Sequence, residues 1–107
     1  MGDVADFAVA VDRLDHCVVV RVEGELDMAS ASELEDAVSR VTSSPHVVID
    51  LGSCTFLDST GMHVITETMR KAPRMSVVAT DPGVLRVLGI AAVDTMVAVH
   101  ASVEDAL

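Results

Sequence analysis

The chain has 107 residues, and we expect residues 1–107 to form a single domain with one modest core. Half of the residues are apolar but only two are aromatic, so aliphatic side chains must fill the core and platforms for stacking bases are missing. The 17 acidic and 7 basic residues give a formal charge of −10, which disfavours nucleic acid and anionic membranes as partners and leaves solubility or a basic protein partner as explanations.

The opening residues MGDVADF show neither the basic nor the apolar region of a secretory signal. No apolar run approaches the ~20 residues of a membrane span, so no membrane insertion is expected. Cys17 and Cys54 are far apart and form no CxxC pair, which favours two small buried side chains over a disulfide or a metal pair. These features together predict a cytoplasmic protein.

Two valine-rich runs at the start of the chain predict an antiparallel hairpin, with strands near 6–12 and 16–23. The apolar period then becomes helical, with Leu34 and Val38 on one face. Ser30 and Glu33 have the spacing of a capping box, which predicts a helix that starts near Ser30.

The run HVVIDL (46–51) predicts a short strand buried on both faces, as in a parallel sheet. After the segment GSCTFLD, the spacing of Met62, Ile65 and Met69 predicts a second helix. Asp58 directly precedes this helix and is its expected N-cap.

The remaining third of the chain continues the alternation of strands and helices. MSVVAT and TMVAVH predict strands, DPGVLRVLGI predicts a short helix capped by Asp81 with Pro82 first, and SVEDAL predicts a last turn capped by Ser102. The order β-β-α-β-α-β-α-β-α indicates an α/β fold with a mostly parallel sheet.

The sequence offers little support for an enzyme or for a cofactor. It contains no GxxxxGK[ST] loop and no GxGxxG, and its histidines form no HExxH or Cys/His cluster, so neither a nucleotide cofactor nor a metal is expected. Ser59 and His63 would lie parallel on one helix rather than converge as a triad requires. The stretch DSTG is similar to the aspartic-protease motif, but it has one residue inserted and no second copy.

Ser59 and Thr60 fall in the first turn of the second helix, where backbone N–H groups are still free. A phosphate on Ser59 would lie near those donors and the positive end of the helix dipole, although Asp58 would repel it. The residues alone leave two interpretations open, a phosphorylation site or two ordinary first-turn residues.

Three stretches resemble the STAS domain family, specifically the bacterial anti-sigma factor antagonists: GELDMASASELEDAV (24–38), VVIDLGSCTFLDSTGMHVI (47–65) and LRVLGIAAVDTMVAVHASVEDAL (85–107). They follow the family's order and spacing over nearly the whole chain. The most specific piece is the pattern Asp-Ser-Ser/Thr-Gly-aliphatic after an apolar strand and loop. The resemblance implies a STAS-type fold, a small mixed and mostly parallel sheet with helices packed against it.

The resemblance also implies a function. Ser59 would be the phosphorylation site, with Thr60 as the second choice. The unphosphorylated protein would bind an anti-sigma factor that is also a serine kinase and would release the sigma factor. Phosphorylation would end this binding, and a phosphatase would restore it. The alternative within the family is a subunit of a stress-signalling scaffold or of a lipid or anion transport system.

The expected partner-binding residues come from two segments that each follow a strand, which should place them at the same end of the sheet. Met62 is expected to supply a flexible apolar contact, so that Met62→Lys would weaken binding without disturbing the fold. The full set is Glu25, Asp27, Asp58, Ser59, Thr60, Gly61, Met62 and His63.

Overall fold

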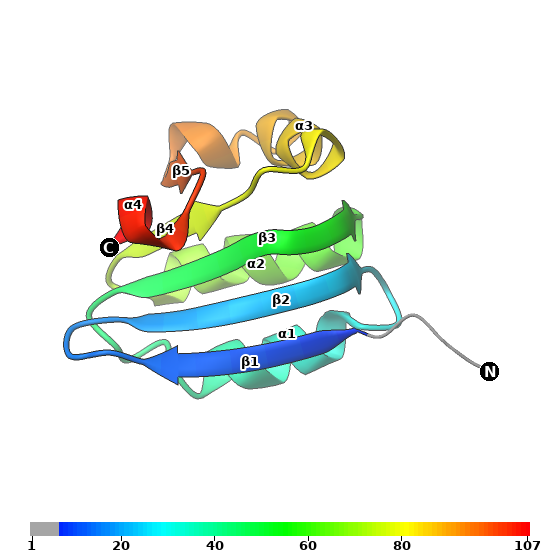
Figure 1. The fold of residues 1–107 in the computed structure, drawn as a ribbon. Coiled ribbons are helices and arrows are strands. Elements are labelled where there is room, and N and C mark those ends of the chain that lie inside the picture. The colour runs from blue at the N-terminus through cyan, green and yellow to red at the C-terminus, as the bar shows by residue number, and fades with distance from the viewer. Residues whose placement is uncertain (1–6) are drawn as a thin grey trace.

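The structure is a computed structural model that describes residues 7–107, and it contains one five-stranded sheet with helices against it (Figure 1). The strands lie in the order of the chain: β1 (Ala8–Arg13), β2 (Val18–Leu26), β3 (Val47–Leu57), β4 (Met75–Val78) and β5 (Ala98–His100). β1 pairs with β2 in antiparallel fashion and the other neighbours are parallel, which confirms the predicted fold class. Asp6, where the first strand was predicted to begin, lies outside the described residues.

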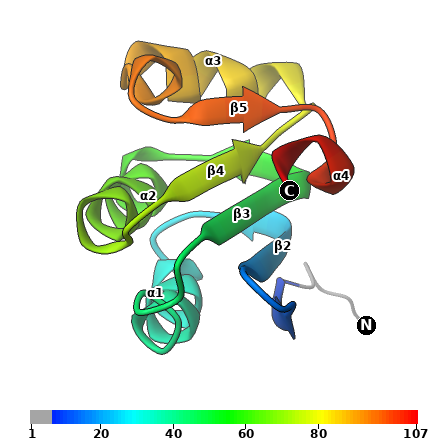
Figure 2. The same ribbon diagram turned by 90° about the vertical axis from the view of Figure 1, so that its left-hand side faces the viewer.

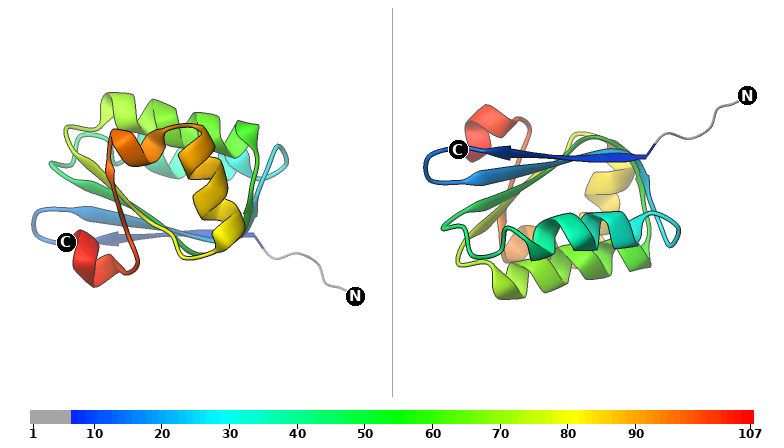
Figure 3. Two further views of the ribbon diagram at one scale, coloured as in Figure 1. Left: turned by 90° about the horizontal axis from the view of Figure 1, so that it is seen from above. Right: turned by 90° about the horizontal axis from the view of Figure 1, so that it is seen from below.

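The helices follow the predicted alternation with the strands. They are α1 (Ala31–Ser39), α2 (Ser59–Lys71), α3 (Pro82–Ile90) and α4 (Val103–Ala106), and a 3-10 turn (Val93–Thr95), which was not predicted, follows α3. α1 and α2 pack side by side on one face of the sheet, and α4 lies on the opposite face (Figures 2 and 3). Within the described residues, none of the helices is both long and apolar enough to cross a bilayer.

The alternation of side chains along the strands explains the two layers. In β2, Val18 and Val20 face the main core under α1 and α2, whereas Val19 faces α4. In β3, Ile49 faces the main core and Val48 faces α4, so both faces are buried as the run HVVIDL predicted. Each such aliphatic side chain contributes roughly 1.5–3 kcal/mol by leaving water.

β3 is longer than predicted, because it continues through GSCTFL to Leu57. The polar residues in this stretch suggested a loop, but β2 accompanies it as far as Leu26. The pairing is irregular on the way, and Gly24 in β2 has a positive φ of 98°. The two central strands therefore extend well beyond β4 and support the start of α2.

Several local predictions are confirmed by the hydrogen bonds. Asp81 accepts from the N–H groups of Gly83 and Val84, and Ser102 accepts from Asp105 N–H. Cys17 and Cys54 are free and buried. Burial raises the pKa of the Cys54 thiol, which keeps it protonated and unreactive.

Candidate functional site

The start of α2 is fixed by Asp58, as predicted. Asp58 has an extended backbone, and its Oδ1 accepts a hydrogen bond from Gly61 N–H at 3.0 Å. Its carbonyl oxygen accepts the first helical bond, from Met62 N–H at 2.9 Å. Within the described residues no hydrogen bond uses the N–H groups of Ser59 and Thr60. Two backbone donors therefore remain available beside the Ser59 hydroxyl.

Gly61 lets α2 approach the end of β2 closely. A Cβ at this position would lie 2.6 Å from Leu26 Cγ, 2.9 Å from Leu26 O and 3.0 Å from Leu57 Cδ1. Real Cβ atoms do not tolerate contacts this short, so only glycine fits without movement of the helix. The glycine of the DSTG stretch is thus explained by packing.

The two predicted segments do meet at one end of the sheet. Leu26 pairs with Leu57 in the parallel ladder, and Asp58 N–H continues the ladder to Leu26 O at 3.3 Å. Glu25 stands opposite Phe56. The β2–α1 loop and the start of α2 are consequently neighbours held by backbone bonds.

The β2–α1 loop is folded around Ser30, and here the predicted capping box is wrong. Ser30 precedes α1, but its side chain makes no cap hydrogen bond. Its Oγ donates instead to Glu25 O at 2.7 Å and accepts from Asp27 N–H at 3.0 Å. Asp27 Oδ1 accepts from the N–H groups of Ala29 and Ser30, which makes a tight turn. The hydroxyl is buried in the loop and so cannot serve the helix.

The predicted partner-binding residues divide by exposure. Four are exposed, two are half-buried and two are buried: Glu25, Ser59, Thr60 and His63; Asp27 and Asp58; Gly61 and Met62. Met62 was expected to be a surface contact, but only 7% of it is exposed and it belongs to the main core. The expectation for Met62 is therefore wrong, because its position in the helical turn points it at the sheet.

Two exposed apolar residues near Ser59 were missed from the sequence. Met28, at the tip of the β2–α1 loop, is 79% exposed, and Phe56, the partner of Glu25 in the ladder, is 48% exposed. Both carried a signal that could have been used. Met28 is a large apolar residue in a polar turn. Phe56 and Leu57 are neighbours, and in an extended strand successive side chains point to opposite faces, so one of the two must face outward.

The site has few features of a catalytic centre. No described hydrogen bond joins Ser59 to His63, although they lie one turn apart on α2. Within residues 7–107, no group of three or more His, Cys, Asp or Glu side chains is arranged to hold a metal ion. What the arrangement offers is an exposed hydroxyl on a rigid helix start, bordered by carboxylates and by two exposed apolar side chains.

Comparison with known proteins identifies the family. The model of the STAS domain matches residues 8–106, and the chain belongs to this family.

The relatives within the family have a common description. The anti-sigma-F factor antagonist RsfB of Mycobacterium tuberculosis is 28% identical over 107 residues, which covers 94% of this chain and 88% of that protein. The crystal structure of an anti-sigma factor antagonist from Mycobacterium paratuberculosis has a TM-score of 0.89 and 32% identity, over 94% of this chain and 91% of that one. The unphosphorylated anti-sigma factor antagonist SpoIIAA shares the fold, with a TM-score of 0.77 and 20% identity over 92% of both chains.

Proposed function

We propose that this protein is an anti-sigma factor antagonist and that Ser59 is its phosphorylation switch. The unphosphorylated form binds an anti-sigma factor with serine kinase activity and thereby releases a sigma factor. Phosphorylation of Ser59 ends this binding, and a phosphatase reverses it. The proposal places the protein in the cytoplasm and gives it no catalytic activity of its own.

The observation that carries the proposal is the exposed Ser59 at a helix start whose geometry does not depend on the Ser59 side chain. Asp58 caps the helix and Gly61 packs it against β2. Within the described residues the Ser59 hydroxyl makes no hydrogen bond, so it is free for modification. Relatives described as anti-sigma factor antagonists support the choice of partner class.

We define the partner surface as Glu25 of β2, Asp27 and Met28 of the β2–α1 loop, Phe56 of β3, and Ser59, Thr60 and His63 of α2. Met62 is left out of this surface because it is buried. Met28 and Phe56 provide the exposed apolar area instead. The carboxylates favour a basic face on the partner and would increase the rate of encounter.

The same phosphate has different energetic effects on the fold and on the complex. It adds about −1.5 to −2 charges. At the helix start the free N–H groups partly accommodate this charge, so stability should change by about 1 kcal/mol or less. In the interface the charge must lose water against a surface shaped for a neutral hydroxyl. A cost of roughly 3 kcal/mol there weakens binding more than a hundredfold.

The test begins with recovery of the anti-sigma factor from native lysate of the source organism and measurement of its affinity by calorimetry. Ser59→Asp should bind poorly, while Ser59→Ala should bind constitutively and resist the kinase. Thr60→Ala is the matched control and should still be phosphorylated. Phosphate located on Thr60 by mass spectrometry, or wild-type affinity of Ser59→Asp, would contradict the assignment of Ser59.

The apolar part of the partner surface has its own test. Met28→Lys should weaken binding while the circular dichroism spectrum and the melting temperature stay unchanged, because the Met28 side chain is mostly in solvent. Leu107→Lys is a control, since Leu107 is also exposed but lies near the opposite end of the sheet. Equal affinities for both variants and the wild type would remove Met28 from the partner surface. Recovery of membrane transport proteins or of large STAS assemblies from the lysate would favour the alternative subtype.

A further inference from the structure

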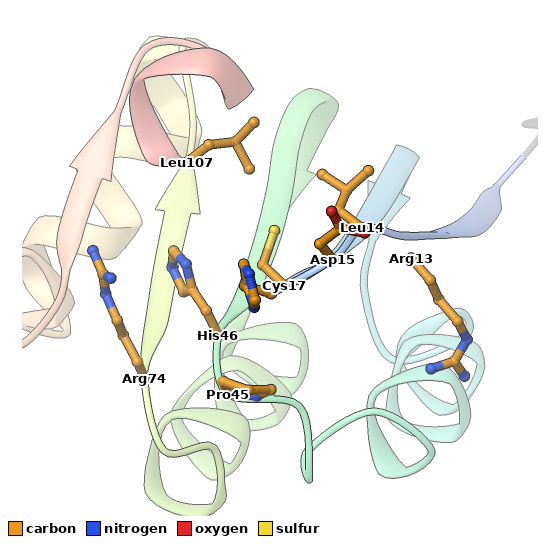
Figure 4. A pocket seen from close by; sticks show the side chains of 9 residues that line it. Arg13, Leu14, Asp15, Cys17, Pro45, His46, Arg74 and Leu107 are labelled. Atoms are coloured by element: carbon orange, nitrogen blue, oxygen red, sulfur yellow. The ribbon is translucent and has the colours of Figure 1, made fainter.

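The end of the sheet opposite Ser59 contains an open cleft of about 710 Å³. It lies where β2, β3 and β4 begin, whereas Ser59 follows the end of β3. The β1–β2 turn forms one wall, Arg74 and Leu107 form the other, and Cys17, Pro45 and His46 lie between them (Figure 4).

Two arginines line the cleft in a strongly acidic chain. The lining includes Arg13 and Arg74, two histidines, His16 and His46, and one acidic side chain, that of Asp15. Within residues 7–107 neither of the two arginines has a carboxylate in ion-pair range, whereas three other arginines do. The guanidinium donors of Arg74 beside the cleft are therefore available to an external anion.

His46 provides a second and independent observation. Its residue is only 6% exposed, and its Nε2 lies 2.8 Å from Ser76 Oγ, while no described hydrogen bond uses Nδ1. Burial, with the neighbouring positive charges of Arg74 and His100, lowers the pKa of His46, so the ring is neutral at pH 7. When Ser76 donates to Nε2, Nδ1 carries the proton and remains a donor without a partner. In this tautomer Nδ1 can donate a hydrogen bond to a molecule in the cleft that His46 lines.

The remaining lining sets the kind of anion. Leu14, Cys17 and Leu107 give the cleft an apolar part, and the Leu107 side chain lies above the opening in Figure 4. The volume falls within the usual range of small-molecule sites. The Arg13 guanidinium points away from the centre, whereas Arg74 and His46 extend side by side (Figure 4). We propose that the cleft binds a small organic anion, a carboxylate or phosphate ester with a short apolar group, through Arg74 and His46.

The test is a titration of the full chain with hexanoate and with phenyl phosphate, followed by 1H–15N NMR. Hexanamide and phenol are the neutral counterparts. We expect saturable shifts at the amides of Cys17, His46 and Arg74 with either or both anions, and weaker shifts with the neutral compounds. Saturation by only one of the anions identifies the headgroup, carboxylate or phosphate, that the cleft accepts.

Two arginine variants decide whether the binding is specific. Arg74→Gln should weaken binding of the anion about tenfold, because it removes a charge-assisted hydrogen bond. Arg86→Gln changes the net charge equally but lines a groove at the Ser59 end, so it should leave the affinity unchanged. Equal weakening by both variants, equal binding of neutral compounds, or no saturable shift with either anion would overturn the proposal. Ser59→Asp should leave anion binding unaltered, which keeps this test separate from that of the proposed switch.

Discussion

Replacement of Gly61 by alanine tests the close approach of α2 to the end of β2. The added Cβ would meet Leu26 Cγ at 2.6 Å and the Leu26 carbonyl oxygen at 2.9 Å, and a backbone atom in the sheet has little freedom to move. Overpacking of a filled core costs about 1–3 kcal/mol, and alanine regains about 1 kcal/mol of helix propensity. We therefore expect Gly61→Ala to lower the free energy of unfolding by about 2 kcal/mol, near the upper end of the net range.

The assay is urea and thermal unfolding followed by circular dichroism. At roughly 4 °C per kcal/mol for a domain of this size, Gly61→Ala should melt about 8 °C below the wild type. Gly89→Ala is the matched control, because it makes the same change within α3, where the nearest atom is 3.9 Å from the added Cβ. This control should melt at the same temperature or up to about 4 °C higher. A Gly61→Ala protein as stable as Gly89→Ala would refute the packing argument.

Three further predictions concern other parts of the fold. Met62→Lys should destabilise the protein by several kcal/mol in urea unfolding, on the order of 3 or more, because it places a charge in the core, whereas Met28→Lys should not; equal stabilities would show that Met62 is not buried. Asp58→Ala should lower the free energy of unfolding by about 1 kcal/mol in the same assay, because the hydrogen bond from Gly61 N–H to the cap is lost; an unchanged urea midpoint would show that this bond does not stabilise the fold. NMR titration should give His46 a pKa below the ordinary 6.5. Because the unfolded chain then binds the proton more tightly, the contribution of His46 to stability should be complete above pH 6.5 and decline as the pH falls through its folded pKa; a pKa at or above 6.5 would contradict this.

The strands and helices were predictable because each follows a local pattern. The run 46–51 is mostly apolar and is buried on both faces. The side chains of Asp58, Asp81 and Ser102 accept hydrogen bonds from N–H groups in the first turn of the helix that each one precedes. Such features depend on neighbours within about four positions in the chain.

Two failures arose where the hydrogen-bond partners lie outside the strand or helix whose pattern was used. The extension of β3 to Leu57 depends on β2, whose polar end still supplies ladder bonds. Ser30 has the sequence spacing of a cap, but its hydroxyl is used by Glu25 and Asp27 in a turn that the helix pattern does not reveal.

Met62 is a different case, because the sequence contained the correct answer. Its spacing with Ile65 predicted a core face, whereas its position beside Ser59 at the expected end of the sheet suggested a flexible apolar contact. The structure agrees with the spacing, since both side chains are buried. Apolar periodicity was here the better guide to which side chain faces solvent. The roles of Ser59 and its neighbours in binding remain predictions.

The rigid start of α2 has a consequence for how an enzyme would reach Ser59. The backbone on either side of this residue is held by hydrogen bonds. They form the N-cap, the first helical turn and the ladder bond from Asp58 N–H to Leu26 O. A kinase that required an extended substrate strand would first have to unwind this turn and open the end of the sheet. A kinase that acts on Ser59 in the native protein must instead recognise a three-dimensional epitope assembled from β2, β3 and α2. A linear peptide of residues 53–65 would lack that epitope, and kinases that read short linear motifs would have no access to the native serine.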